Sequence, residues 1–226
     1  MLPEHTNRAG TMSSNPATAS RIYNLLKADI TAGRFAPGKL LVERSLAAEY
    51  GTSVTPVRNA ASQLVGERLL APHPGGGYEL PMLDSEQLRD LYFWHSQLVR
   101  IALNPKRMID PSDRHCAFEA VYDLSTPTGT ALAAADLFGL IARLSPSQEL
   151  QAAVLSAGDR LGAVRRVEPT LLNGTAEEIV AVQGLTAAGR WSDLVSAIWA
   201  YHRRRLRRAG ELAVALQMKE GEGIGG

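Results

Sequence analysis

The sequence predicts a mainly α protein, with an N-terminal winged helix-turn-helix followed by a C-terminal all-α helical bundle. Two observations lead to this fold class. Residues 21–82 hold three short helical patterns and then two short extended runs around a glycine-rich tip. From residue 83 onwards the apolar pattern keeps the period of a helix, and no further strand pattern follows.

The first helical pattern begins after Ser20, a residue type that caps helices, and ends at Gly33. A second helix is expected over residues 43–50. A third follows Ser53, and its apolar side chains at Val57, Ala60, Ala61, Leu64 and Val65 form one stripe. Residues 69–73 and 78–80 then read as two strands of a hairpin, joined by the Pro-Gly-Gly-Gly run. Three helices and such a hairpin make a winged helix-turn-helix.

The remainder is expected to be helical, with breaks at proline and glycine. The expected helices cover residues 86–103, 114–122, 130–144, 147–167, 176–188 and 191–218. We expect this domain organisation: a disordered leader (1–20), the winged helix-turn-helix (21–82), a linker (83–86), the helical domain (87–218) and a disordered tail (219–226).

Composition limits the function classes. The 226 residues carry 24 basic and 23 acidic side chains, so any attraction to nucleic acid depends on where the charges point. A single cysteine, Cys116, excludes an internal disulfide framework and favours a cytoplasmic location. No run of 18 uncharged apolar residues is present, so we expect no membrane span.

Several segments of the first unit carry a recognisable signature. They are residues 30–38 (ITAGRFAPG), 41–47 (LVERSLA), 53–58 (SVTPVR) and the wing 74–78 (PGGGY). Their order and spacing resemble the DNA-binding domain of GntR-family bacterial transcriptional regulators. The helical remainder is similar in size to the FCD ligand-binding domain of the FadR-like subfamily, through residues 88–92 (LRDLY) and the turn at 187–189 (AAG).

A recognition helix reads base edges in the major groove with side chains near its N-terminus. Here these are Ser53, Val54, Thr55 and Arg58, with Arg44 on the preceding helix placed for a phosphate or guanine. We expect the wing to approach the minor groove with His73 and Gly75.

The chain departs from the family where arginine is usual, because it has Val54. Valine offers only apolar contact, so we expect a different operator or weaker selectivity. The resemblance further implies a homodimer on a pseudo-palindromic operator in double-stranded DNA, with repression more usual than activation.

Many domains of the FadR-like subfamily hold a divalent metal through an aspartate and three histidines. None of these four positions matches here: Asp136 is one residue out of register, and His202 is adjacent to the position occupied by Tyr201. We therefore predict no metal and no cofactor, although a shifted register leaves Asp136 and His202 as a residual pair. His95 and His115 are interpreted as surface or satisfied core histidines.

Without a metal, the bundle is expected to hold a more apolar cavity for a small-molecule effector. Its candidate lining is Tyr92, His95, Phe138, Ile179 and Tyr201, with Trp94 and Trp199 nearby. Taken one by one, these side chains are favoured as core residues over ligand contacts. The run at 202–208 (HRRRLRR) is either an extra contact for DNA or an acidic partner, or a solvated helix face, which we favour.

An enzyme and a protein-interaction module are the two other function classes. No nucleophile with a base, no phosphate loop and no metal-ligand spacing is present in the sequence, so we do not expect an enzyme. The alternative to a regulator is a dimerising protein-interaction module whose specific DNA readout is weakened or lost, and Val54 is the feature that supports it.

Overall fold

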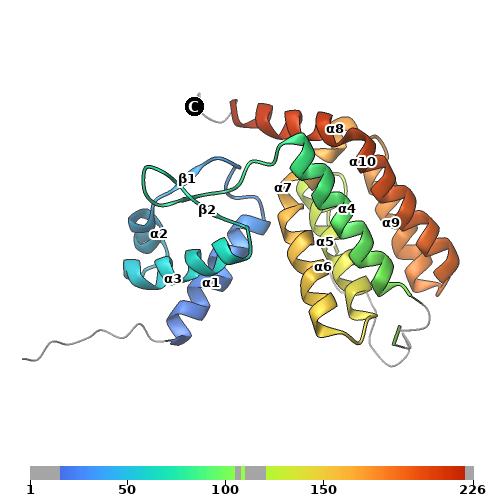
Figure 1. The fold of residues 1–226 in the computed structure, drawn as a ribbon, viewed down its shortest axis with the longest axis horizontal. Coiled ribbons are helices and arrows are strands. Elements are labelled where there is room, and N and C mark those ends of the chain that lie inside the picture. The colour runs from blue at the N-terminus through green and yellow to red at the C-terminus, as the bar shows by residue number, and fades with distance from the viewer. Residues whose placement is uncertain (1–15, 105–107, 110–120, 222–226) are drawn as a thin grey trace, which may run out of the picture.

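The structure is a computed structural model that describes residues 16–104, 108–109 and 121–221. It is mainly helical, with a small first domain and a larger helical one side by side (Figure 1). The predicted fold class is confirmed: a helix-turn-helix domain with a small sheet precedes an all-helical domain.

In the first domain, the long helix α1 packs against α3, and a three-stranded antiparallel sheet completes the fold in the order β1-β3-β2. The elements are α1 (Pro16–Thr31), β1 (Leu40–Leu41), α2 (Glu43–Glu49), α3 (Val54–Gly66), β2 (Ala71–Pro72) and β3 (Tyr78–Glu79). Helix α1 begins at Pro16, so residues 16–20 are helical and the expected leader is too long.

The apolar stripes of the three helices meet in one core. Ile22 and Leu26 of α1 and Val57 and Leu64 of α3 are fully buried in it. The wing closes against β1 at Gly77, where a Cβ atom would lie 2.6 Å from the carbonyl oxygen of Leu41. The wing glycine is therefore required by this close approach as well as by its positive φ.

The second domain is a bundle in which α4 and α10 form the longest helix pairing. Its helices are α4 (Ser85–Ala102), α5 (Pro127–Arg143), α6 (Gln148–Arg160), α7 (Gly162–Arg165), α8 (Glu168–Leu171), α9 (Thr175–Ala187) and α10 (Trp191–Gly221). Asp84 caps α4 in a capping box with Gln87, which fixes where the bundle begins.

Two expectations for the bundle are wrong in detail. The single helix expected over 147–167 is divided into α6, α7 and the turn that leads to α8. Helix α10 continues to Gly221, so the expected tail begins too early. Most of the helix expected over 114–122 lies outside the described residues, as do His115 and Cys116.

The domains touch where α7 meets the end of α1. The Arg166 guanidinium donates a hydrogen bond from Nη1 to the carbonyl oxygen of Thr31 at 3.0 Å. It lies against Gly33, where a Cβ atom would come within 2.4 Å of Arg166 Nε. Lys27 of α1 forms an ion pair with Asp159 of α6 at 3.0 Å. None of the helices in the described ranges is long and apolar enough to cross a membrane.

Candidate nucleic-acid interface and buried polar cluster

The N-terminus of α3 presents the residues that sequence reasoning chose for base contact. Ser53 and Thr55 are exposed, and Val54 is half-buried. The Ser53 side chain makes no capping hydrogen bond to α3. Arg44, on α2, is exposed on the neighbouring helix. The first turn of α3 therefore offers backbone N–H groups and hydroxyls to an approaching phosphate.

Arg58 is held in a fork by Glu43 of α2. Its Nε lies 3.1 Å from Glu43 Oε1 and its Nη2 lies 2.9 Å from Glu43 Oε2. The Arg58 side chain nevertheless remains 61% exposed. These hydrogen bonds lower the pKa of the Glu43 carboxyl. Sequence reasoning missed this pair, which orders the arginine before any DNA is present.

The wing carries His73 at its base. The Nδ1 atom of His73 accepts a hydrogen bond from the backbone N–H of Gly75 at 3.0 Å. Because Nδ1 accepts, a neutral imidazole carries its proton on Nε2, which lies 3.9 Å from Glu79 Oε2. Gly75 is exposed at the tip. The wing is thus a defined turn, and it places the His73 ring N–H close to the exposed backbone of Gly75.

The first domain matches a known protein family, and short parts of the chain match known proteins in sequence. Residues 18–80 match the family model described as "Bacterial regulatory proteins, gntR family". These residues are similar to that family, and we call them the gntR-type domain. The chain is 37% identical over 70 residues to the HTH-type transcriptional repressor GlaR of Escherichia coli K12, and 32% identical over 71 residues to the HTH-type transcriptional regulator McbR of the same organism. Each alignment covers 31% of this chain and 32% of the relative, so the chain spans about a third of these relatives in sequence.

Solved structures extend the likeness to the fold of both domains. The chain superposes on a GntR transcriptional regulator from Rhodococcus sp. RHA1 with a TM-score of 0.69 and 19% identity, covering 85% of this chain and 97% of the other. It superposes on E. coli McbR/YncC with a TM-score of 0.59 and 17% identity, covering 88% and 99%. The helical domain therefore shares a fold with the second domain of gntR-type proteins.

The five predicted effector-pocket residues are all buried in that helical domain. Tyr92, His95, Phe138, Ile179 and Tyr201 are each at most 1% exposed. Phe138 lies edge-on to His95, with ring centroids 4.6 Å apart, and also contacts Tyr201 at 5.1 Å. Trp94 and Trp199, which were expected nearby, are instead 52% and 50% exposed.

The surroundings of these five residues are not the apolar cavity lining that we expected, because charged side chains are buried beside them. Arg205 donates hydrogen bonds from Nε and Nη2 to Glu168 Oε2 at 2.9 and 2.6 Å, and from Nη1 to Glu178 Oε2 at 2.8 Å. Tyr92 donates its hydroxyl to Glu168 Oε1 at 2.6 Å. Burial raises the pKa of the Tyr92 hydroxyl well above its ordinary value, so it stays protonated as a donor.

Two histidines are joined by hydrogen bonds beside these charges, and the donor in each bond can be assigned. His202 Nδ1 lies 2.8 Å from the carbonyl oxygen of Ile198, which can only accept, so this nitrogen carries a proton. Burial lowers the pKa of His202 to about 3 and that of His95 well below its ordinary value, so both rings are neutral. His202 Nε2 then accepts from His95 Nδ1 at 2.8 Å. Consequently, His95 Nε2 is left as a bare lone pair.

Arg165 lies beside the two histidines, and its guanidinium lacks a full set of hydrogen-bond partners. Its side chain is 1% exposed, and Nη1 donates to the carbonyl oxygen of Gly158 at 3.2 Å. Within the described residues, Arg165 Nε and Nη2, His95 Nε2 and the Tyr201 hydroxyl have no hydrogen-bond partner. A Cβ atom on Gly158 would lie 3.8 Å from Arg165 Nη1 and 3.9 Å from His95 Nε2. A glycine therefore faces the place where these groups converge.

The arginine run at 202–208 is not the uniformly solvated face that we favoured. His202 and Arg205 are 0% and 1% exposed. A signal was available: Leu194, Ile198, Tyr201 and Arg205 fall at spacings of four, three and four, so the apolar stripe itself carries Arg205 inward. Arg165 and Glu168 were missed for the same reason, because a charged residue was assumed to point outward.

Asp136 and His202, the two residues left as possible metal ligands, do not lie together. Asp136 is exposed and accepts a hydrogen bond from the Tyr122 hydroxyl at 2.8 Å, whereas His202 faces His95. Within the ranges that the structure describes, no three His, Cys, Asp or Glu side chains are grouped as metal ligands.

Proposed function

We propose that the protein is a DNA-binding transcriptional regulator that acts as a homodimer on a pseudo-palindromic operator. The observation that carries this proposal is the gntR-type domain at residues 18–80, with an exposed first turn of α3 and an ordered arginine beside it. Repression is favoured over activation, because the related DNA-binding domain of GlaR belongs to a protein named as a repressor.

In this proposal α3 lies in the major groove. Arg58 reads a guanine, Ser53 and Thr55 contact phosphate or base edges, and Arg44 contacts the backbone. Val54 contributes an apolar contact, such as one to a thymine methyl group. The wing approaches the minor groove through His73 and Gly75, where the ring N–H and the backbone reach the DNA.

Dimerisation is supported by exposed apolar side chains on α4 and α10. Ile101 of α4 is 49% exposed, and Val195 and Trp199 of α10 are 37% and 50% exposed. A pocket of about 140 Å³ lies between the same helices, and its lining includes Val195 and Trp199 together with Ser96 and Arg100. Exposed apolar side chains of this kind are typical of a protein–protein contact, and a symmetric pair is the commonest solution.

The helical domain is proposed to bind a small anionic effector at Arg165. The buried guanidinium offers Nε and Nη2 to an acceptor, and His95 Nε2 offers a lone pair to a donor. A small carboxylate that also carries a hydroxyl group satisfies both. The effector would act by favouring one arrangement of the bundle and thus one spacing of the two recognition helices.

Selection from a randomised duplex pool at fixed salt tests the DNA-binding proposal. We expect enrichment of a palindrome, and loss of that enrichment in Arg58→Ala. The matched control is Arg89→Ala, which removes an exposed arginine from α4, outside the gntR-type domain. Screening small carboxylates for a change in affinity for the enriched duplex, in wild type and Arg165→Met, tests the effector.

The alternative is a dimerising interaction module whose specific DNA readout is lost, and Val54 is the observation in its favour. If only weak and strongly salt-dependent binding appears, with no enriched sequence, the alternative stands and the regulator is rejected.

A further inference from the structure

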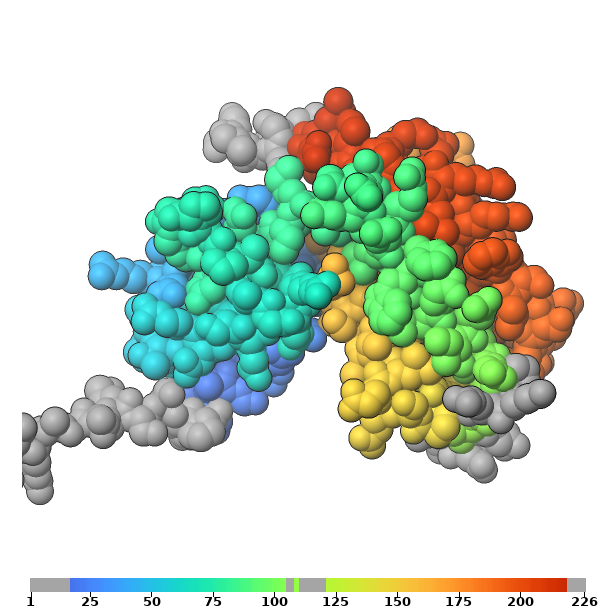
Figure 2. Space-filling view, in the orientation of Figure 1, coloured from blue at the N-terminus to red at the C-terminus, as the bar shows by residue number. Residues whose placement is uncertain are grey.

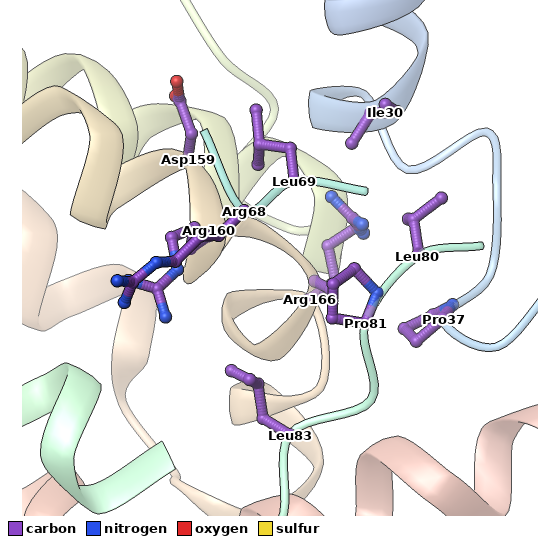
Figure 3. Close-up of a pocket in the computed structure, with 11 residues that line it drawn as sticks. Ile30, Pro37, Arg68, Leu69, Leu80, Pro81, Leu83, Asp159, Arg160 and Arg166 are labelled. Carbon is purple, nitrogen blue, oxygen red and sulfur yellow. The ribbon is translucent and has the colours of Figure 1, made fainter. Parts of the chain in front are cut away.

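A cleft runs between the two domains, away from the recognition helix and from the buried cluster of the bundle. Figure 2 shows a hollow between the first domain and the helices that face it. One part of the cleft, of about 550 Å³, is lined by Arg68, Met82, Asp90, Trp94 and Arg160, among others. It continues into a smaller recess of about 40 Å³, which also includes Arg166 (Figure 3).

Three arginines reach this cleft from different segments. Arg68 comes from the turn after α3, Arg160 ends α6 and Arg166 follows α7 (Figure 3). Arg160 and Arg68 are close enough that the charge of Arg68 lowers the pKa of Arg160, in addition to the larger effect of burial. The cleft thus places two like charges from opposite domains against each other.

The acidic groups around the cleft are largely engaged elsewhere. Asp159 pairs with Lys27 at 3.0 Å, and Lys27 also pairs with Glu67 at 2.8 Å. Asp90 on α4 lines the wider part of the cleft. The basic groups in and beside the cleft are three arginines and Lys27, and the acidic groups are Asp90, Asp159 and Glu67. The cleft and its surroundings therefore keep a net positive charge.

The backbone at Arg68 directs this arginine into the cleft. Its φ is 59°, and it is the one residue other than glycine with positive φ in the described part of the chain. This conformation caps the C-terminus of α3, because the backbone N–H groups of Arg68 and Leu69 donate to the carbonyl oxygens of Val65 and Leu64 at 3.0 and 2.9 Å. The cap therefore fixes the backbone from which Arg68 enters the lining of the cleft.

An apolar wall lies beside the arginines. Trp94 of α4 is 52% exposed and Met82 of the interdomain segment is 42% exposed, and both line the wider part of the cleft with Leu83 and Leu91. An indole face next to guanidinium groups suits a flat or aliphatic group that carries an acid.

We propose that this cleft binds an oxyanion, a carboxylate or a phosphate carried on an apolar group, which bridges Arg68 of the first domain and Arg160 of the second and packs against Trp94. This is a second ligand site, and it does not depend on the proposed effector site at Arg165. Because the anion cancels the repulsion between two domains, its binding stabilises their present arrangement and hence the position of α3.

The test is calorimetric titration of the full chain with phenyl phosphate, phenylacetate and uncharged phenol. We expect one saturable site per chain for at least one anion and none for phenol. The affinity should fall by about tenfold or more in Arg68→Gly and in Arg160→Met, since a charged hydrogen bond is lost in each. Arg68→Gly also relieves the positive φ, so the fold is retained.

Two controls separate this site from others. Arg89→Ala removes an exposed arginine of α4 that does not line the cleft, and should bind like wild type. Arg165→Met should also bind like wild type; if it alone loses the anion, the anion occupies the bundle core and the proposal fails. Comparing the phosphate with the carboxylate identifies the preferred oxyanion.

Three further results would overturn the proposal. They are equal affinity in Arg68→Gly and wild type, no saturable binding of either anion at millimolar concentration, and a change of oligomeric state in Trp94→Ala without any anion response. The last would show that the cleft is a contact between copies of the chain. Selection of DNA from the randomised pool is a separate readout, so failure here leaves the regulator proposal standing.

Discussion

Two arginines of the first domain and two of the helical domain lie in opposite environments. In the gntR-type domain Arg44 and Arg58 are exposed, so water can hydrate their guanidinium groups. In the helical domain Arg165 and Arg205 are each 1% exposed. A buried charge is costly unless it is paired, so the second domain must balance its arginines internally or with a ligand.

Within the bundle, the two buried arginines differ in how completely their charges are paired. Arg205 has Glu168 and Glu178 as partners and lies over the Tyr201 ring, 3.3 Å from its centroid. Arg165 has a backbone carbonyl and the Phe138 ring, 5.0 Å from its centroid, and two of its nitrogens have no described partner. An identical substitution at the two positions should therefore have opposite effects.

The largest expected effect is that of Arg205→Met. It leaves Glu168, which is 3% exposed, as a buried carboxylate without its cation. Breaking a buried pair in this way costs about 3–5 kcal/mol. Urea unfolding of the full chain measures the loss. Arg207→Met, an exposed neighbour on α10, should change stability by less than about 0.5 kcal/mol.

Arg165→Met should have the opposite sign. Removing an uncompensated buried charge and filling its volume with an apolar side chain is expected to be neutral, or to stabilise by about 1–4 kcal/mol. The same variant should lose any response to an anionic effector. A destabilisation as large as that of Arg205→Met, in the same urea experiment, would mean that Arg165 is already compensated in the free protein.

The contrast between the domains also explains what could be predicted from the sequence. The first domain was predictable because its helices obey periodicity and its turns use glycine and proline at positions that require them, such as Gly77 in the wing. The exposed residues at the start of α3 followed from where that helix begins. The Glu43–Arg58 fork did not, since it depends on the distance between two helices.

The bundle was predictable only in outline. Its helices and its buried aromatic residues followed from the apolar stripes, but the buried cluster did not, because periodicity says which face a residue lies on and not which partner it meets. Glu168 and Arg205 are 37 residues apart, and His95 and His202 are 107 apart. Such pairings are set by the packing of α4, α8 and α10, which sequence spacing does not show.

The two buried histidines of the helical domain make the stability of the protein depend on pH. His202 has its pKa lowered to about 3, so the unfolded state takes up a proton that the folded state does not. The contribution of His202 is fully present above about pH 6.5 and is lost as the pH falls toward 3. Stability should then fall by about 1.4 kcal/mol per pH unit for each such histidine.

Urea unfolding between about pH 6.5 and pH 5 measures this slope, and His202→Gln should reduce it by one histidine's share. A wild-type slope in His202→Gln would show that other groups cause the pH dependence.

The smallest expected effect concerns Glu43, the partner of Arg58 at the DNA-binding end. Glu43→Gln removes a charge from a solvent-exposed pair, so stability should be unchanged in the urea experiment. If the fork positions Arg58 for base reading, discrimination between the selected operator and a site altered at the guanine should fall by less than about tenfold. Affinity for random DNA should rise instead, because a negative charge near the phosphates has been removed. Parallel titrations of both duplexes at two salt concentrations separate these effects. A rise in affinity for both duplexes, with discrimination kept, would show that Glu43 only competes with DNA for Arg58 and does not orient it.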